Sequence, residues 1–100
     1  MLYLAVYDIE DDRLRDKVSQ RLIRFGFERI QFSVFVGNLN PTQKQKLDIT
    51  ILKLLEKVDE QKYKYMTMPL AESYVYKADW LGKEKPSWDY HCGNQHTLIL

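Results

Sequence analysis

The first third of the chain has the periodicity of a strand followed by a helix. Residues 2 to 9 form a nearly continuous apolar run, which is typical of a buried strand. Residues 12 to 25 then place an apolar side chain every three to four positions, as an amphipathic helix does. We expect Asp11 or Asp12 to cap this helix and Gly26 to end it, because glycine readily adopts the left-handed conformation found after a helix C-terminus.

A second strand and helix are predicted after Gly26. Residues 28 to 39 alternate between two faces with no turn-forming pair, so the alternation alone predicts one long strand, bent or broken at most in its middle. The run Asn40-Pro41-Thr42-Gln43 predicts a helix start, with asparagine as the cap and proline at the first helical position. The apolar stripe that follows extends this helix to about residue 58.

The remaining residues are less regular. Residues 62 to 70 are predicted to form a strand that Pro69 stops, and residues 72 to 81 form a weaker candidate strand. Residues 83 to 95 are polar and rich in turn-forming residues, so we expect them to be irregular. Residues 96 to 100 are apolar to the last position and are expected to add a strand to a sheet edge. We therefore expect one domain, with its body at residues 1–82 and a tail at residues 83–100.

The order of these elements predicts an α+β sandwich. Two helices can cover only one face of its sheet, yet the first strand is apolar on both faces, with Leu2, Leu4 and Val6 on one of them. A lone domain would leave a large apolar patch in water. The sequence therefore predicts a homodimer closed by two-fold symmetry, in which the final strand can add to the partner's sheet.

The composition is that of an ordinary globular protein, with 45% hydrophobic and 29% charged residues. No apolar stretch approaches the ~20 residues that a transmembrane helix needs. The N-terminus enters a strand without a basic leader, so we expect no signal peptide. Cys92 has no second cysteine to pair with, which suits a reducing cytoplasm.

Positive charge is concentrated in the first predicted helix and the segment after it. Residues 13 to 29 hold six basic side chains against two acidic ones, although the whole chain carries a net charge of only +1. On the helix, four of them share one face, and we call them the basic ridge: Arg13, Lys17, Arg21 and Arg24. The basic ridge indicates a polyanionic partner, although a solvated helix face would have the same pattern. Arg15 lies on another side, close to the end of the first strand.

Asp8 is the principal candidate for chemistry. It lies near the end of the first strand, on the same face as Leu4 and Val6. A carboxylate there is costly to desolvate unless it meets a cation, a hydrogen-bond donor or the open rim of a cleft. An aspartate at the end of a strand is ordinarily a turn residue, and one just before a helix is ordinarily its cap. We accept the capping role for Asp11 or Asp12, but we expect Asp8 to have a functional role.

Two stretches resemble a known protein family. They are Tyr3-Leu4-Ala5-Val6-Tyr7-Asp8-Ile9, followed by Arg13-Leu14-Arg15, and Arg29-Ile30-Gln31-Phe32-Ser33-Val34-Phe35-Val36-Gly37-Asn38-Leu39. Together they are similar to the small CRISPR-associated endoribonucleases, the second of the Cas proteins and the partner of the spacer integrase. The resemblance is dense over residues 3 to 39, and it implies a role in CRISPR adaptation, the acquisition of new spacers.

The resemblance also implies a structure and a site. It implies a ferredoxin-like βαββαβ fold, with residues 29–39 supplying two strand segments, and a homodimer that exchanges C-terminal strands. It implies a divalent metal, usually Mg²⁺ with Mn²⁺ as the alternative, held between the Asp8 residues of the two subunits. The positions that match the family near this site are Arg15, Lys17, Arg29 and Phe35. Tyr7 is expected to pack at the dimer face beside Asp8.

Two functions fit these residues. The first is a metal-dependent endonuclease that hydrolyses phosphodiester bonds of RNA or DNA, in which Asp8 holds the metal. Arg15 and Arg29 would then hold the scissile phosphate, and Arg13 and Lys17 would contact the nucleic-acid backbone. The second is a dimeric DNA-binding scaffold that bridges the spacer integrase and has no catalysis of its own.

Overall fold

The computed structural model describes residues 1–93 of the chain. Its main body contains four strands and two long helices: β1 (Leu2–Ile9), α1 (Asp12–Arg24), β2 (Glu28–Gln31), β3 (Val34–Asn38), α2 (Pro41–Leu55) and β4 (Tyr63–Leu70). A short 3₁₀ helix, η1 (Glu60–Lys62), precedes β4, and two short helices follow it, α3 (Glu72–Val75) and α4 (Trp88–His91). The predicted segment at residues 96 to 100 lies outside the described residues.

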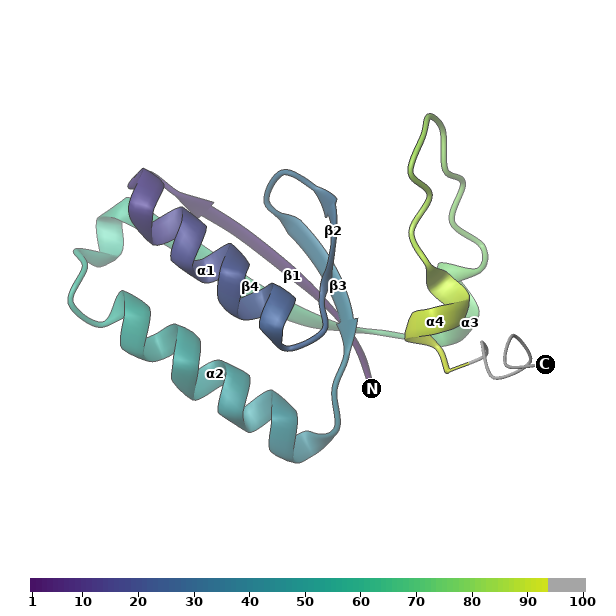
Figure 1. Cartoon of the computed structure of the whole chain (residues 1–100), viewed down its shortest axis with the longest axis horizontal. Helices are drawn as coiled ribbons and strands as arrows, with labels where there is room; N and C mark the ends of the chain where they lie inside the picture. The colour runs from purple at the N-terminus through teal and green to yellow at the C-terminus, as the bar shows by residue number, and fades with distance from the viewer. Residues whose placement is uncertain (94–100) are drawn as a thin grey trace.

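The four strands form one antiparallel sheet in the order β2-β3-β1-β4 (Figure 1). The chain passes through α1 between β1 and β2 and through α2 between β3 and β4, which is the βαββαβ order. This confirms the predicted α+β, ferredoxin-like fold. β1 is central, with β3 on one side and β4 on the other, so residues near the end of β1 lie at the middle of one sheet end.

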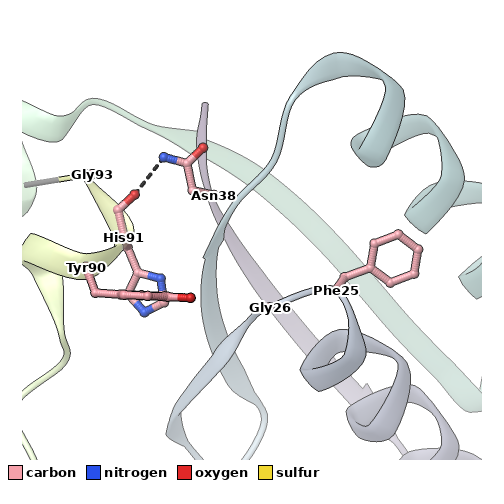
Figure 2. Close-up of a pocket in the computed structure, with 6 residues that line it drawn as sticks. All are labelled: Phe25, Gly26, Asn38, Tyr90, His91 and Gly93. Carbon is pink, nitrogen blue, oxygen red and sulfur yellow. Dashed lines mark hydrogen bonds between the residues drawn. The ribbon is translucent and has the colours of Figure 1, made fainter. Parts of the chain in front are cut away.

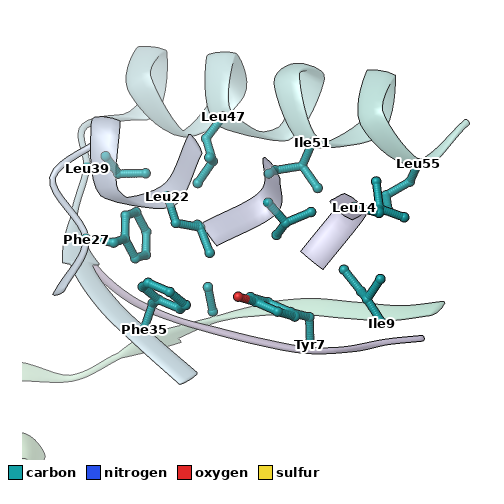
Figure 3. Packing of buried hydrophobic residues seen from close by; sticks show 12 residues of the cluster. Tyr7, Ile9, Leu14, Leu22, Phe27, Phe35, Leu39, Leu47, Ile51 and Leu55 are labelled. Atoms are coloured by element: carbon teal, nitrogen blue, oxygen red, sulfur yellow. The ribbon is translucent and has the colours of Figure 1, made fainter. Parts of the chain in front are cut away.

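Both long helices cover the same face of the sheet (Figure 3). β1 sends Ala5, Tyr7 and Ile9 into the core beneath them. The helices and the other connected segments contribute the remaining buried members: Leu14, Val18, Leu22, Phe27, Phe35, Leu39, Leu47, Ile51 and Leu55. Because side chains alternate along a strand, Leu4, Val6 and Asp8 point to the other face. We call that other face the open face.

Local signals start and end the helices as expected. The Asp11 carboxylate accepts a hydrogen bond of 2.8 Å from the backbone N–H of Leu14, which makes Asp11 the cap of α1. Gly26, with φ of +89°, follows the end of α1. At α2, Asn40 and Gln43 form a reciprocal capping box, and Pro41 is the first helical residue. α2 ends at Leu55, three residues before the predicted limit.

The alternation over residues 28 to 39 corresponds to two strands, because the predicted long strand is broken in its middle, and the two segments implied by the family resemblance are confirmed. The chain turns at Phe32 and Ser33, between β2 and β3. The pairing slips by one residue between Arg29 and Gln31, as in a β-bulge. The turn has a single turn-favouring residue, Ser33, and no glycine, asparagine or proline, so its signal in the sequence is weak. The Ser33 carbonyl accepts a hydrogen bond from the Tyr7 backbone N–H, which joins the turn to β1.

The strand predicted over residues 62 to 70 is confirmed as β4, but Pro69 does not stop it. β4 continues through Pro69 to Leu70, because β4 is an edge strand and can lack one backbone donor. The strand predicted over residues 72 to 81 was wrong. The chain then forms α3, where residues 72 to 81 were expected to form a strand. Leu70 is already paired with Leu2, the first residue of β1, so the central strand offers no further backbone to pair with. The helical turn instead buries Val75 against Leu2 and Val36.

The segment expected to be irregular contains α4, and polar contacts hold α4 to the sheet. The Glu28 carboxylate accepts a hydrogen bond from the Ser87 backbone N–H and lies 2.8 Å from Nε2 of His91. The Asn38 side-chain amide donates to the His91 carbonyl. Trp88 and Cys92 pack with α3 against Leu2 and Val36. The α3–α4 segment therefore covers the end of the open face opposite to Asp8. No helix among the described residues is long and apolar enough to cross a membrane.

Gly37 on β3 should be intolerant of a side chain. A Cβ added there would lie 2.6 Å from Cδ1 of Phe27, which is buried between the sheet and α1. Gly37→Ala should therefore lower the free energy of unfolding by about 1–3 kcal/mol, measured by urea denaturation. In a Phe27→Leu background the same substitution should cost less, because the obstructing ring is gone. An equal cost in both backgrounds would show that Phe27 is not the cause.

Candidate functional site

Asp8 lies at the end of the open face. It is exposed, and it is paired with Lys64 of β4 in the strand register, so both side chains lie on the same face of the sheet. Within residues 1–93 its carboxylate makes no ion pair or hydrogen bond. Asp8 and Glu10 line one wall of a small pocket of about 60 Å³, and Gln61, Lys62, Tyr63 and Lys64 line the rest. The carboxylate is thus available to a ligand.

Arg15 of α1 is held in a fixed position beside the end of β1. Its guanidinium donates a hydrogen bond of 2.9 Å to the carbonyl of Ile9, the residue after Asp8, and it is also paired with the Asp12 carboxylate. The side chain is only 25% exposed. The predicted position of Arg15 close to the end of the first strand is therefore confirmed, and its role beside Asp8 stays a prediction. Because the guanidinium of Arg15 already makes two contacts within the chain, it has fewer N–H groups free to donate to a ligand than an unpaired arginine has.

Arg29 lies on β2, at the rim of the sheet and on the side covered by the helices. Its guanidinium carbon lies 5.1 Å from the centroid of the Phe35 ring, to which it is paired in the strand register. Phe35 is fully buried and stacks on Tyr7 with 6.0 Å between ring centroids. Arg29 itself is exposed. Phe35 and Tyr7 thus form a stacked aromatic pair, and the charged end of Arg29 lies against the Phe35 ring.

Tyr7 is not at the open face, so its expected position at a dimer face was wrong. It is 4% exposed, and its ring lies in the core beneath the helices (Figure 3). The alternation of β1 requires this, since Tyr7 and Asp8 are consecutive. Burial raises the pKa of the Tyr7 phenol, although the nearby Arg29, Ser19 and Arg15 act to lower it. The hydroxyl completes no hydrogen bond of normal geometry.

The basic ridge follows the outer side of α1. Arg13, Lys17 and Arg24 are exposed, and Arg21 is partly buried. None of the four makes an ion pair within residues 1–93. Four positive charges along one exposed helix face, without acidic partners, form a surface suited to a phosphate backbone.

The open face between Asp8 and the α3–α4 segment is apolar. Leu4 and Val6 of β1 are only partly buried there, and Met66 and Met68 of β4 are exposed directly beside them. Val34 of β3 flanks Val6 on the other side. These five side chains form a continuous apolar surface next to an unpaired carboxylate.

Phe32 is a further residue at this end of the sheet, and the sequence did not point to it. It lies on the turn between β2 and β3 with 68% of its surface exposed, and the Arg15 guanidinium carbon lies 5.4 Å from the centroid of its ring. In one continuous strand over residues 28 to 39, Phe32 would lie on the same apolar face as Ile30 and Val34. Phe32 is exposed instead because the chain turns at this residue, and the alternation did not predict the turn.

A larger pocket lies at the other end of the molecule (Figure 2). It has a volume of about 440 Å³ and is lined by Phe25, Gly26, Asn38, Tyr90, His91 and Gly93. The polar groups of Asn38 and His91 are bonded within the chain. This pocket lies away from Asp8, and the hydrogen bonds of Asn38 and His91 within the chain give no indication of a catalytic role for it.

A single chain supplies only part of a binding site for a divalent cation at Asp8. No group of three or more histidine, cysteine, aspartate or glutamate side chains within residues 1–93 could hold a metal ion. Mg²⁺, however, retains several waters and needs only one or two protein carboxylates. Asp8 offers one exposed carboxylate per chain, so two chains would offer a pair.

Comparisons with known proteins agree with this fold. A family model described as CRISPR associated protein Cas2 matches residues 1–77. CRISPR-associated endoribonuclease Cas2 1 of Archaeoglobus fulgidus is 47% identical over 47 residues, covering 47% of this chain and 50% of that protein. CRISPR-associated endoribonuclease Cas2 2 of Pyrobaculum aerophilum is 40% identical over 67 residues, covering 54% of this chain and 74% of that protein. The first match thus spans half the length of the relative.

Two solved structures share the fold. A crystal structure of Streptococcus pyogenes Cas2 at pH 6.5 has a TM-score of 0.69 at 18% identity and covers 82% of this chain and 100% of its own. A hypothetical protein from Thermus thermophilus has a TM-score of 0.63 at 33% identity and covers 70% of this chain and 80% of its own.

Two tyrosines of the sheet, the buried Tyr7 and the partly buried Tyr65, should make the protein sensitive to alkali. Burial raises the pKa of Tyr7 and of Tyr65, whereas in an unfolded chain tyrosine titrates near its ordinary value of about 10. Above that pH the unfolded chain loses protons that the folded chain retains, so stability is lost as pH rises past about 10. Urea midpoints at pH 9 and pH 11 should show this loss, and Tyr65→Phe should reduce it. Tyr74→Phe, at an exposed position, is the control; an equal reduction in the control would contradict the assignment.

Proposed function

This chain belongs to the CRISPR-associated Cas2 family, and from that premise we propose that it is a metal-dependent endonuclease of CRISPR adaptation. The observation that carries the proposal is the exposed, unpaired Asp8 carboxylate on the open face, with Arg15 anchored at the adjacent Ile9 carbonyl. A solvent-accessible carboxylate can hold a divalent cation, and such an ion can support phosphodiester hydrolysis.

The active unit is a homodimer that packs the open faces of two chains together. The exposed Met66 and Met68 and the partly buried Leu4, Val6 and Val34 supply the apolar surface that a second copy would bury. A two-fold axis through this surface relates the two Asp8 residues, which lie at its edge. Because this apolar surface lies next to Asp8, formation of the dimer would also bring the second Asp8 carboxylate to the site.

Asp8 from each subunit would hold one Mg²⁺, or Mn²⁺ in its place. Two carboxylates close together repel each other, and a divalent cation between them removes that penalty. The bound ion would supply an activated water and would neutralise charge on the phosphate. Lys64, across the strand register from Asp8, adds positive charge to the same face. The chain's own part is to fix the carboxylate at a rigid strand rather than on a loop.

The arginines would bind the substrate. Arg29 reaches solvent from a base of packed aromatic rings, so its fork of N–H groups can donate to the oxygens of the scissile phosphate. Arg15 would add its charge from a fixed position and orient the end of β1. Arg13 and Lys17 on the basic ridge would contact neighbouring phosphates, which positions the strand without reading its sequence. Cleavage adds water across one P–O bond and leaves a phosphate and a hydroxyl end.

A second function rests on the same surfaces. In it, the dimer is a scaffold that holds DNA on the basic ridges of its two chains and bridges the spacer integrase, and Asp8 performs no chemistry. The unpaired charges of the basic ridge favour this alternative as strongly as they favour a nuclease. The two functions differ in whether Asp8 is required for a chemical step.

Replacement of Asp8 separates these functions. With Mg²⁺ or Mn²⁺, purified protein should cleave labelled single-stranded RNA or duplex DNA, and Asp8→Ala should reduce the rate by about 100-fold or more, because the metal ligand is lost. Asp79→Ala, at an exposed position in the irregular segment after α3, is the matched control and should retain activity. Light scattering should show that both variants keep the dimer mass.

The scaffold would be favoured by the opposite result. If the wild-type protein cleaves neither substrate with either metal, while wild type and Asp8→Ala bind duplex DNA equally well, the endonuclease proposal is wrong.

A further inference from the structure

Phe32 is unusual because it is both exposed and held in place. A phenylalanine with 68% of its surface in water gains little from burial, so packing does not explain its position at the tip of the β2–β3 turn. One side of its ring is nevertheless in contact with a charge, the Arg15 guanidinium at 5.4 Å from the ring centroid. This distance is within the range of a cation–π interaction.

Arg15 is itself immobilised, and this fixes the orientation of the ring. Its guanidinium is bonded to the Ile9 carbonyl and to the Asp12 carboxylate, so it cannot easily follow a moving side chain. The turn that carries Phe32 is tied to β1 by the hydrogen bond from the Tyr7 N–H to the Ser33 carbonyl. The ring is therefore an aromatic platform that is already ordered before a ligand arrives, which lowers the entropic cost of binding.

We propose that Phe32 is a stacking platform for one unpaired nucleobase, and that it places the adjoining phosphodiester at the end of β1 that carries Asp8. The inference rests on the proposed function and specifies its substrate as a nucleic acid with at least one unstacked base. Every base has a π-face, so stacking on Phe32 tolerates any base and carries little sequence preference. The Arg15 guanidinium against the ring adds attraction for the phosphates on either side of the stacked base.

The position of Phe32 agrees with this role. The Tyr7–Ser33 hydrogen bond places the turn next to the residue that precedes Asp8, and Arg15 touches both Phe32 and the Ile9 carbonyl. One arginine thus links the aromatic platform to the carboxylate end of β1. In an intact duplex the bases are stacked on each other and cannot reach an exposed ring. The platform therefore favours single strands, loops or ends over continuous duplex.

Binding measured without cleavage tests this inference separately from the nuclease activity. The probes are a fluorescently labelled 12-nucleotide single-stranded RNA, the corresponding single-stranded DNA, the blunt duplex, and an abasic single strand with the same number of phosphates. Titrations of the full chain are made with a chelator present, so no metal-dependent hydrolysis is involved. The RNA and DNA arms determine which sugar is preferred.

Phe32→Ala should weaken binding of the base-containing single strand by about fivefold or more, because one stacked base is lost. It should leave binding of the abasic strand unchanged, and Phe32→Tyr should restore wild-type affinity. Tyr74→Ala is the matched control: Tyr74 is 70% exposed and lies 5.3 Å from the Lys77 ammonium, but it is on α3, at the opposite end of the sheet. This control should bind every probe as the wild type does.

Three results would overturn the inference. The first is unchanged affinity of Phe32→Ala for the base-containing strand. The second is an equal loss for the base-containing and abasic strands, which would assign the effect to phosphate contacts. The third is a change in the dimer mass of Phe32→Ala, measured by light scattering, which would make Phe32 a subunit contact. Absence of cleavage with added metal, together with the predicted binding pattern, would reject the nuclease and retain the platform.

Discussion

The two-sided apolar character of β1 is the constraint on which the remaining structure depends. β1 is the central strand, and its two sets of side chains need two different coverings. α1 and α2 cover the face that carries Ala5, Tyr7 and Ile9. The α3–α4 segment covers only the end of the other face, around Leu2 and Val36. What remains uncovered is an apolar surface that ends at Asp8, and the proposed dimer and metal site both follow from it.

The surroundings of Asp8 combine rigidity with access. Asp8 lies near the end of the central strand, where it is paired with Lys64 of β4, and the pairing of β1 with β3 ends at Val6. Arg15 joins the end of β1 to the β2–β3 turn through the Ile9 carbonyl and the Phe32 ring. Arg29 contacts the buried Phe35 ring on the side of the sheet covered by the helices. Arg15 and the exposed Phe32 ring lie at the same end of the sheet as Asp8, where a phosphate and its base could be bound together.

Much of the fold could be predicted from residue patterns, because local signals and long-range packing agree over β1, α1 and α2. The Asp11 cap, the Asn40 capping box and the Gly26 stop all act where expected. The predictions failed where the secondary structure of a segment depends on its contacts with the rest of the fold. The β2–β3 turn uses Phe32 and Ser33, of which only serine favours turns, and α3 replaces a strand because β1 has no backbone left beyond Leu2. For the candidate site, the positions of Asp8 and Arg15 at the end of β1 were predicted, whereas Tyr7 was assigned to the wrong face and Phe32 was missed.

The central claim is that two chains share one metal site, and counting bound ions tests it most directly. Titration of Mn²⁺ into the purified protein, followed by calorimetry or electron paramagnetic resonance, should give one tightly bound ion per two chains. Asp8→Asn should abolish this binding while light scattering still shows a dimer. One ion per chain, or undiminished binding in Asp8→Asn, would contradict a site shared between the two Asp8 carboxylates.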